Sequence, residues 1–229
     1  MKHKFVSKIL RIAYSVLDVI APRLCANCGK EAYNFALLCD HCAKSIIIAT
    51  SPQQIGKHLL FSATDYRDSA AQNLIKTMKY DCVISAGAPL AKIILQHLDI
   101  AGFKQIIPSD KNIFLVPVPI HFIKQLRRGF NQSEILANII GNNLGITVIK
   151  ALRRRIYTTA QSNIADNKVR SLNIKNCFAL ARGAIKIPPK SVIIILDDVV
   201  TSGATIKEAA RIIKPLHPSQ IIFISASAC

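Results

Sequence analysis

The residues with the clearest chemistry lie in one run of thirteen, from Ile193 to Thr205. An unbroken apolar segment, Val192 to Leu196, leads into it, and such β-branched segments are typical of strands buried on both faces of a parallel sheet. Two carboxylates, Asp197 and Asp198, follow directly. A pair of this kind suits a vicinal diol or a hard cation such as Mg²⁺.

A turn rich in hydroxyl groups comes next, and apolar spacing predicts a helix over residues 206–216 after it. Backbone N–H groups at a helix N-terminus attract phosphate, and a glycine lets the backbone approach the anion closely. No lysine follows the glycine, so the turn is not a P-loop. The predicted phosphate-binding residues are Thr201, Ser202, Gly203, Ala204 and Thr205. The alternative is a buried strand that ends in a solvated acidic turn.

Four cysteines form a second group with defined chemistry. Cys25 and Cys28 make one Cys-x-x-Cys pair, and Cys39 and Cys42 make another shortly afterwards. Two such pairs at close spacing predict a tetrahedral thiolate site for a structural Zn²⁺, closed to substrate because all four ligands come from the protein. Nothing in the sequence indicates secretion, so disulfides are not expected. A redox-active pair is the alternative.

A basic loop is predicted beyond another strand. The strand, residues 113–118, ends in prolines that cannot continue a central ladder. Lys124 to Arg128 then forms a loop expected at the same sheet edge as the acidic pair, where Arg127 and Arg128 would offer cations to a diphosphate. The alternative is a solvated basic turn.

Composition narrows the class of partner. The chain has 229 residues and a formal net charge of +17. This charge indicates an anionic partner such as nucleic acid, anionic lipid or a phosphorylated substrate. The alternative is that the charge only keeps the protein soluble. A basic amphipathic helix is predicted at the N-terminus, too short and too charged to span a membrane. That helix packs on the protein or lies on a membrane surface.

The remaining patterns alternate between strand and helix, which favours an α/β fold with a parallel sheet. Strands are expected over residues 59–66 and 221–225, and helices over residues 69–80 and 85–98. The expected organisation is an amphipathic helix (1–21), a zinc-ribbon module (22–55) and an α/β domain (56–229).

The thirteen-residue run resembles the phosphoribosyl diphosphate (PRPP) signature of type I phosphoribosyltransferases. The resemblance implies that Asp197 and Asp198 hold the ribose hydroxyls together with Mg²⁺, and that Thr201 to Thr205 hold the 5′-phosphate. In several branches the first residue of that turn is an aspartate acting as general base. Here Thr201 stands in its place, so any acid–base step must come from elsewhere.

A second resemblance covers nearly the whole chain. The Pro-Val-Pro strand end followed by Arg128-Gly129-Phe130-Asn131-Gln132 is similar to the ComF family, which carries an N-terminal zinc module on a phosphoribosyltransferase-type domain and is linked to DNA uptake in natural transformation. A later segment agrees, with Gln161, Arg170, Asn173 and Phe178.

The resemblance implies a type I phosphoribosyltransferase-like parallel sheet with a small N-terminal zinc-ribbon module. It implies structural Zn²⁺, and Mg²⁺ with PRPP. The partners it implies are single-stranded DNA and proteins of the uptake machinery, and the location is cytoplasmic or at a membrane periphery. Three functions stay open: a phosphoribosyltransferase with an unknown acceptor, a PRPP-binding module, and a catalytically silent DNA-binding adaptor.

Overall fold

The computed structural model describes residues 23–32, 37–108, 111–156 and 174–229. The expected helix over residues 1–21 lies outside these ranges, as do Gln161, Arg170 and Asn173. Within the described ranges, no helix is long and apolar enough to cross a membrane.

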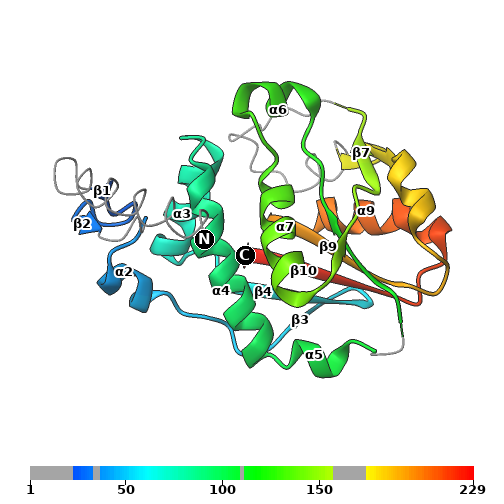
Figure 1. Ribbon diagram of the computed structural model, residues 1–229, viewed down its shortest axis with the longest axis horizontal. Coiled ribbons are helices and arrows are strands. Elements are labelled where there is room, and N and C mark those ends of the chain that lie inside the picture. The colour runs from blue at the N-terminus through cyan, green and yellow to red at the C-terminus, as the bar shows by residue number, and fades with distance from the viewer. Residues whose placement is uncertain (1–22, 33–36, 109–110, 157–173) are drawn as a thin grey trace, which may run out of the picture.

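A six-stranded sheet forms the centre of the molecule, in the order β3-β4-β10-β9-β5-β6 (Figure 1). All neighbouring strands are parallel except β3, which pairs antiparallel with β4 at one edge. The parallel sheet expected from the sequence is therefore confirmed, with one antiparallel edge strand. The strands are β3 (Gln53–Ile55), β4 (His58–Asp65), β5 (Ile113–Pro117), β6 (Thr147–Val148), β9 (Val192–Val200) and β10 (Gln220–Ala228).

Helices cover both faces of this sheet, because alternate side chains of β9 point to opposite faces and are apolar on both. Ile194 and Leu196 pack into one core cluster with α3, α4 and α7, whereas Ile193 and Ile195 pack into the other with α9. A strand whose two sets of alternate side chains are both apolar must be buried on both faces. The main helices are α3 (Ser69–Lys79), α4 (Gly87–Ile100), α7 (Gln132–Leu144) and α9 (Ala204–Ile213).

Shorter elements complete the domain. An antiparallel pair, β7 with β8, lies beside α9. The short elements are α5 (Phe103–Ile106), α6 (Phe122–Arg128), β7 (Leu152–Arg154), β8 (Phe178–Leu180) and the 3₁₀ helices η1 (Ile84–Ala86), η2 (Arg182–Lys186) and η3 (Lys214–Leu216).

The N-terminal module contains a small hairpin, β1 (Arg23–Leu24) with β2 (Glu31–Ala32), and the helix α2 (Asp40–Ser45). Its apolar residues, including Leu38 and Cys42, belong to the same core cluster as Leu74 of α3. The Asn73 side-chain amide of α3 donates to Asn27 Oδ1 in the module, at 3.1 Å. The module therefore packs directly on the α/β domain, and β3, which follows it, pairs with the main sheet.

Candidate functional site

The acidic pair lies on β9 just beyond the point where β5 stops pairing with this strand. Pairing with β5 ends at Pro117 opposite Leu196, whereas pairing with β10 continues to Val200. Strand β9 therefore runs through Asp197 and Asp198, four residues further than the sequence indicated. The carboxyl ends of parallel strands are where open α/β sheets bind ligands.

The start of α7 holds the first carboxylate in place. Ser133 Oγ donates to Asp197 Oδ1 at 3.1 Å, and the backbone N–H of Asp198 donates to the same oxygen at 2.9 Å. Asn131 caps α7 by accepting from the Ser133 N–H, and its amide donates to the Val118 carbonyl. The Asn-Gln-Ser segment thus ties the end of β5 to the acidic pair. Sequence reasoning did not assign this positioning role to Ser133.

Lys79 is a site residue that the sequence analysis missed. Its Nζ lies 2.9 Å from Asp198 Oδ1, and the side chains of Lys79 and Asp198 are 23% and 11% exposed. Burial lowers the pKa of Lys79, but the charge of Asp198 and the hydrogen bond to it outweigh burial and leave the pKa raised. Lys79 is the last residue of α3, and only the packing of α3 brings it to β9.

The two carboxylates have different neighbours, and those of Asp197 change its pKa. Burial, followed by the negative charge of Asp198, raises the pKa of Asp197 to about 7, and Lys79 and the hydrogen bonds to Asp197 oppose this shift. Asp198 lies in contact with the Lys79 ammonium. Two neighbouring carboxylates ionise together more readily when cations compensate them. The pair is therefore suited to a ligand that brings positive charge or donates hydroxyl groups.

The segment that follows β5 has a structure that contradicts one prediction. Residues expected as a basic loop fold into the short helix α6, because His121 Nδ1 accepts from the Ile123 N–H and Gly129, at φ 81°, ends the helix. Arg127 is exposed, and Arg128 is half-buried. The expectation of a loop at Lys124–Arg128 was therefore wrong.

Helix α6 nevertheless contributes positive charge near the acidic pair. Burial lowers the pKa of Lys124, and the positive charges of Arg154, Arg128 and Lys79 lower it further. These four side chains therefore form one electrostatically coupled cationic group, and Lys79 is the member that contacts the acidic pair, at Asp198. Arg128 belongs to this group, and no described contact places Arg127 in it.

The hydroxyl-rich turn lies between β9 and α9, as the sequence predicted. Gly203 is the N-cap of α9 with φ 72°, a left-handed conformation that favours glycine. Thr201 and Ser202 are exposed, and Ser202 Oγ accepts from the Ala204 N–H at 3.5 Å. Thr205 is half-buried in the first turn of the helix. The first N–H groups of α9 and these hydroxyls are available to an anion.

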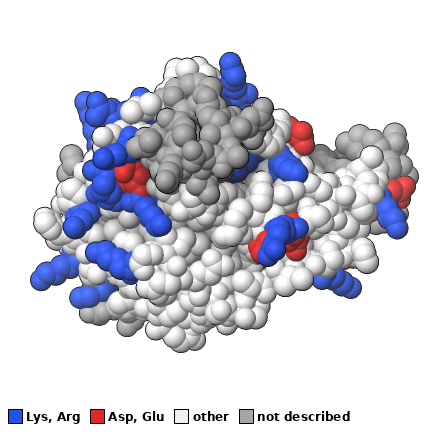
Figure 2. Space-filling view, turned by 180° about the vertical axis from the view of Figure 1, so that it is seen from behind, with Lys and Arg blue, Asp and Glu red and all other residues white. Residues whose placement is uncertain are grey.

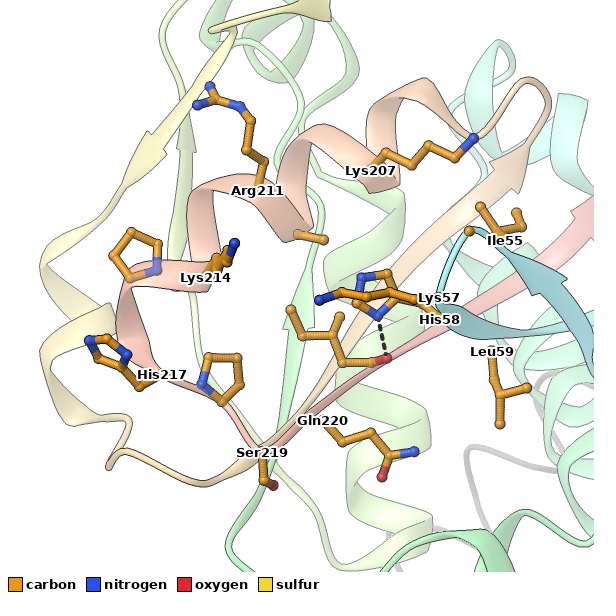
Figure 3. Close-up of a pocket in the computed structure, with 15 residues that line it drawn as sticks. Ile55, Lys57, His58, Leu59, Lys207, Arg211, Lys214, His217, Ser219 and Gln220 are labelled. Atoms are coloured by element: carbon orange, nitrogen blue, oxygen red, sulfur yellow. Dashed lines mark hydrogen bonds between the residues drawn. The ribbon is translucent and has the colours of Figure 1, made fainter.

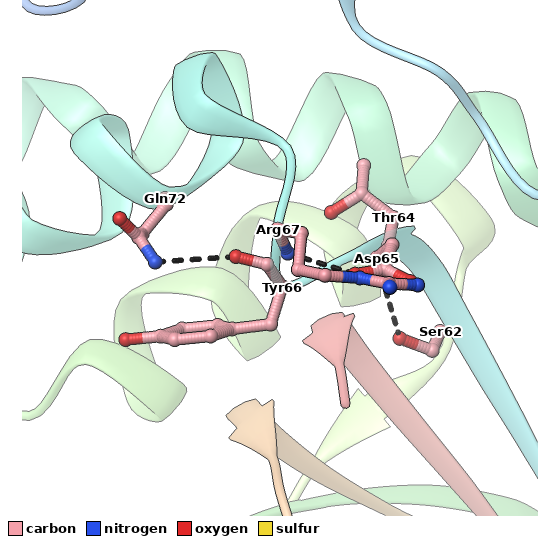
Figure 4. A network of polar contacts seen from close by, with 6 residues as sticks. All are labelled: Ser62, Thr64, Asp65, Tyr66, Arg67 and Gln72. Carbon is pink, nitrogen blue, oxygen red and sulfur yellow. Dashed lines mark hydrogen bonds and ion pairs between the residues drawn. The ribbon is translucent and has the colours of Figure 1, made fainter.

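A hydrogen-bonded turn connects the end of β4 to the start of α3. Arg67 pairs with Asp65 at 2.8 Å, and this hydrogen bond lowers the pKa of Asp65 to about 2. Figure 4 shows this turn, with the Gln72 amide donating to the Tyr66 carbonyl. Asp68 then caps α3 by accepting from the Ala71 N–H at 3.0 Å. The turn matters because α3 carries Lys79 at its other end.

Salt bridges and hydrogen bonds connect α9 to the segment just before β8. Glu208 of α9 accepts from the Asn176 N–H at 2.7 Å and from the Arg211 guanidinium at 2.8 Å. Arg211 also donates to Asn176 Oδ1. Further along, Arg154 lies over the Phe178 ring, 5.4 Å from its centroid. These contacts join the β7–β8 pair to α9, the helix that follows the hydroxyl-rich turn.

The four predicted metal ligands come together in the N-terminal module. The Sγ atoms of Cys25, Cys28, Cys39 and Cys42 all lie within 4.8 Å of one another, and those of Cys28 and Cys39 are 3.7 Å apart. Four thiolates at 2.3 Å from a tetrahedral Zn²⁺ would be about 3.8 Å apart, so the donor set fits zinc. Asn27 donates to Cys42 Sγ at 3.3 Å. His41, which neighbours two of these cysteines in sequence, is exposed and outside the cluster.

We expect Lys79→Met to lower the free energy of unfolding by about 3 kcal/mol, since it leaves Asp198 buried without its cation. Urea unfolding at neutral pH measures this change. The double variant Lys79→Met/Asp198→Asn should recover most of the loss. Lys76→Met, an exposed lysine one turn earlier in α3, is the control and should change stability by less than about 0.5 kcal/mol. Equal losses at Lys76 and Lys79 would contradict a specific ion pair.

Comparison with known proteins finds a matching domain family and relatives of the whole chain. The phosphoribosyl transferase domain family matches residues 81–227. Competence protein F of Haemophilus influenzae is 25% identical over 197 residues, which cover 86% of this chain and 81% of that protein. DNA utilization protein YhgH of Salmonella typhi is 30% identical over 191 residues, covering 83% and 77%.

Among solved structures, adenine phosphoribosyltransferase from Leishmania donovani superposes with a TM-score of 0.40 at 10% identity, over 77% of this chain and 86% of that one. The family match covers well over half of the chain, and the relatives align with most of it. The chain therefore belongs to the ComF family and carries a phosphoribosyl transferase domain.

Proposed function

We propose that the site at the end of β9 binds PRPP with Mg²⁺, in a protein that serves the handling of DNA during natural transformation. The observation that carries the proposal is the acidic pair beside an anion-binding turn. Asp197 and Asp198 lie at the end of a central strand, and Gly203 begins a helix only a few residues later. PRPP has both a ribose diol and a 5′-phosphate, so it would satisfy both halves of the site.

The diphosphate of PRPP would meet the cationic group of the site. Lys79, Lys124, Arg128 and Arg154 provide positive charge there, and Lys79 already contacts Asp198. Bound Mg²⁺ would neutralise part of the diphosphate charge. Charge-assisted hydrogen bonds to phosphate oxygens are stronger than neutral ones, so these residues favour a diphosphate over a sugar monophosphate.

Transfer to an acceptor is a second candidate function, favoured by the raised pKa of Asp197. A carboxylate that titrates near neutral pH is suited to proton transfer. Thr201 supplies no general base, so Asp197 is the acid–base candidate that the described part of the site offers. The relatives named for competence and DNA utilization support a role in DNA uptake and indicate no acceptor.

Calorimetric titration of the full chain tests the binding proposal. We expect PRPP with Mg²⁺ to bind at least about tenfold more tightly than ribose 5-phosphate, since the latter brings no diphosphate to the cationic group. The same titration with single-stranded DNA present asks whether the two ligands compete. Absence of PRPP binding, with DNA binding retained, would overturn the proposal and favour a nucleic-acid adaptor.

A further inference from the structure

Figure 3 shows a groove of about 940 Å³ whose lining residues do not include the acidic pair. It is lined by the β3–β4 hairpin at Lys57 and His58, by α9 and η3, and by the start of β10 at Gln220 and Ile221. These are the amino ends of β4 and β10, whereas Asp197 and Asp198 lie near the carboxyl end of β9. We refer to this feature as the α9 groove.

The α9 groove is strongly cationic. Lys57, Lys207 and Lys214 are exposed, and none of them forms an ion pair with any residue the structure describes. The described lining residues include no aspartate or glutamate. Figure 2 shows Lys and Arg side chains gathered on one side of the face seen from behind. An uncompensated positive groove attracts anions and raises their local concentration.

The cations are spread along the groove rather than gathered at one point. Lys207 and Lys214 are seven residues apart on α9 and η3, which corresponds to about 10 Å along a helix. Lys57 comes from the opposite wall, the hairpin (Figure 3). A single phosphate would engage one of these positions. A row of cations suits an anion with phosphates at regular intervals.

The floor of the groove is apolar, with Ile55, Leu59 and Ile221 among its residues. Among the described lining residues, the only rings are imidazoles and prolines. The His58 ring is held by an edge contact with Phe223 and a 3.1 Å hydrogen bond to the Ile221 carbonyl. The groove therefore offers little for stacking bases, and recognition must rest on the sugar-phosphate backbone.

We propose that the α9 groove binds the backbone of single-stranded nucleic acid without sequence preference, at a site separate from the acidic pair. The choice of nucleic acid over another polyanion rests on the proposed function in DNA handling. Of the three groove lysines, Lys207 lies beside the turn at Gly203, whereas Lys57 and Lys214 lie toward the amino ends of β4 and β10. A nucleic acid held at these amino ends can be bound at the same time as PRPP. The groove thus gives this chain a contact with DNA that leaves the phosphoribosyl site open.

Charge reversal at the two ends of the groove tests the proposal. The test variant is Lys57→Glu/Lys214→Glu in the full chain. Lys207 is left intact because a Cβ at Gly203 would lie 3.5 Å from its Cε, which places Lys207 next to the phosphate turn. The matched control is Lys92→Glu/Lys104→Glu, two exposed lysines on α4 and α5 that change the net charge by the same amount.

Fluorescence anisotropy with a labelled oligothymidylate over a range of salt concentrations provides the readout. We expect the test variant to bind at least about tenfold more weakly than the control variant, with the slope of log K against log salt reduced by about 1.4 relative to wild type. PRPP titration should give the same affinity for both variants. This second measurement separates failure of the groove from failure of the phosphoribosyl site.

Two outcomes would overturn the proposal. Equal losses of DNA affinity in the test and control variants would show that net charge alone matters. Unchanged DNA binding together with lost binding of a polyglutamate peptide would assign the groove to an acidic protein partner. A selective loss of DNA affinity in the test variant, with PRPP binding retained, supports the proposal. If the wild type binds DNA but not PRPP, the phosphoribosyl proposal fails and the proposal for the α9 groove still holds.

Discussion

Replacing Asp197 and Asp198 together by asparagine is expected to weaken the binding of PRPP with Mg²⁺ by about a hundredfold or more. The change removes both negative charges from the end of β9 while keeping side-chain shape. A hard cation prefers carboxylate oxygens, and hydrogen bonds from ribose hydroxyls to a charged acceptor are stronger than those to an amide. Calorimetry of the purified double variant against wild type measures the loss.

Asp65→Asn is the matched control for this experiment. Asp65 ends β4, which is separated from β9 by β10, and its side chain is 49% exposed and paired with Arg67. The same chemical change at this strand end should leave PRPP affinity within about twofold of wild type. Circular dichroism of both variants checks the fold. If the double variant unfolds, the single change Asp197→Asn, which keeps the Lys79–Asp198 ion pair, provides the test instead.

The acidic pair also gives the wild type a pH dependence with a defined sign. Burial and Asp198 raise the pKa of Asp197 to about 7, so the site gains a negative charge as pH rises through that value. Affinity for PRPP with Mg²⁺ should therefore increase between about pH 6 and pH 8 and then level off. Asp197→Asn should abolish this rise. A pH profile that is unchanged in Asp197→Asn would assign the titration to another group.

Much of the ligand site was readable from the sequence because it is local. The apolar run, the two acids and the glycine turn are consecutive, and each imposes its own structure: a strand buried on both faces, a pair of charges and a helix N-terminus. The cysteine cluster was predicted for the same reason, since two short Cys-x-x-Cys pairs largely determine which atoms meet. In both cases the residues that act together are near one another in the chain.

The residues that the sequence analysis missed come from distant segments. Lys79 reaches Asp198 from the last turn of α3, and Ser133 reaches Asp197 from the first turn of α7. Neither residue differs by type or spacing from an ordinary helix-end residue. Their roles depend on how two helices pack over one face of the sheet, which local patterns do not specify.

The error at α6 has a different cause. The segment that follows Pro117 was expected as a loop because it is basic and lies between proline and glycine. A seven-residue helix forms there, since His121 caps its start and Gly129 ends it with a left-handed conformation. Histidine is not among the usual N-cap residues, so the start of this helix was not recognised. In this helix Arg128 is half-buried and Arg127 is exposed. The loop prediction had given both arginines the same role.

Loss of a single cysteine is expected to have the largest effect on the N-terminal module. Cys28→Ser should reduce bound zinc from about one equivalent to well below it, since three thiolates and a hydroxyl hold Zn²⁺ far more weakly than four thiolates. Metal analysis by atomic absorption of the purified protein measures this loss. Cys82→Ser, an exposed cysteine outside the cluster, is the control and should retain full zinc.

The same variant tests whether the module supports the ligand site. Cys42 accepts a hydrogen bond from Asn27, and Asn27 accepts one from Asn73 of α3, the helix whose last residue is Lys79. Because structural zinc sites contribute directly to folding, loss of the metal should loosen this chain of contacts. We therefore expect Cys28→Ser to weaken PRPP binding severalfold without abolishing it. Zinc loss with unchanged PRPP affinity would show that α3 holds Lys79 in place without the module, and stoichiometric zinc in Cys28→Ser would contradict the four-thiolate site itself.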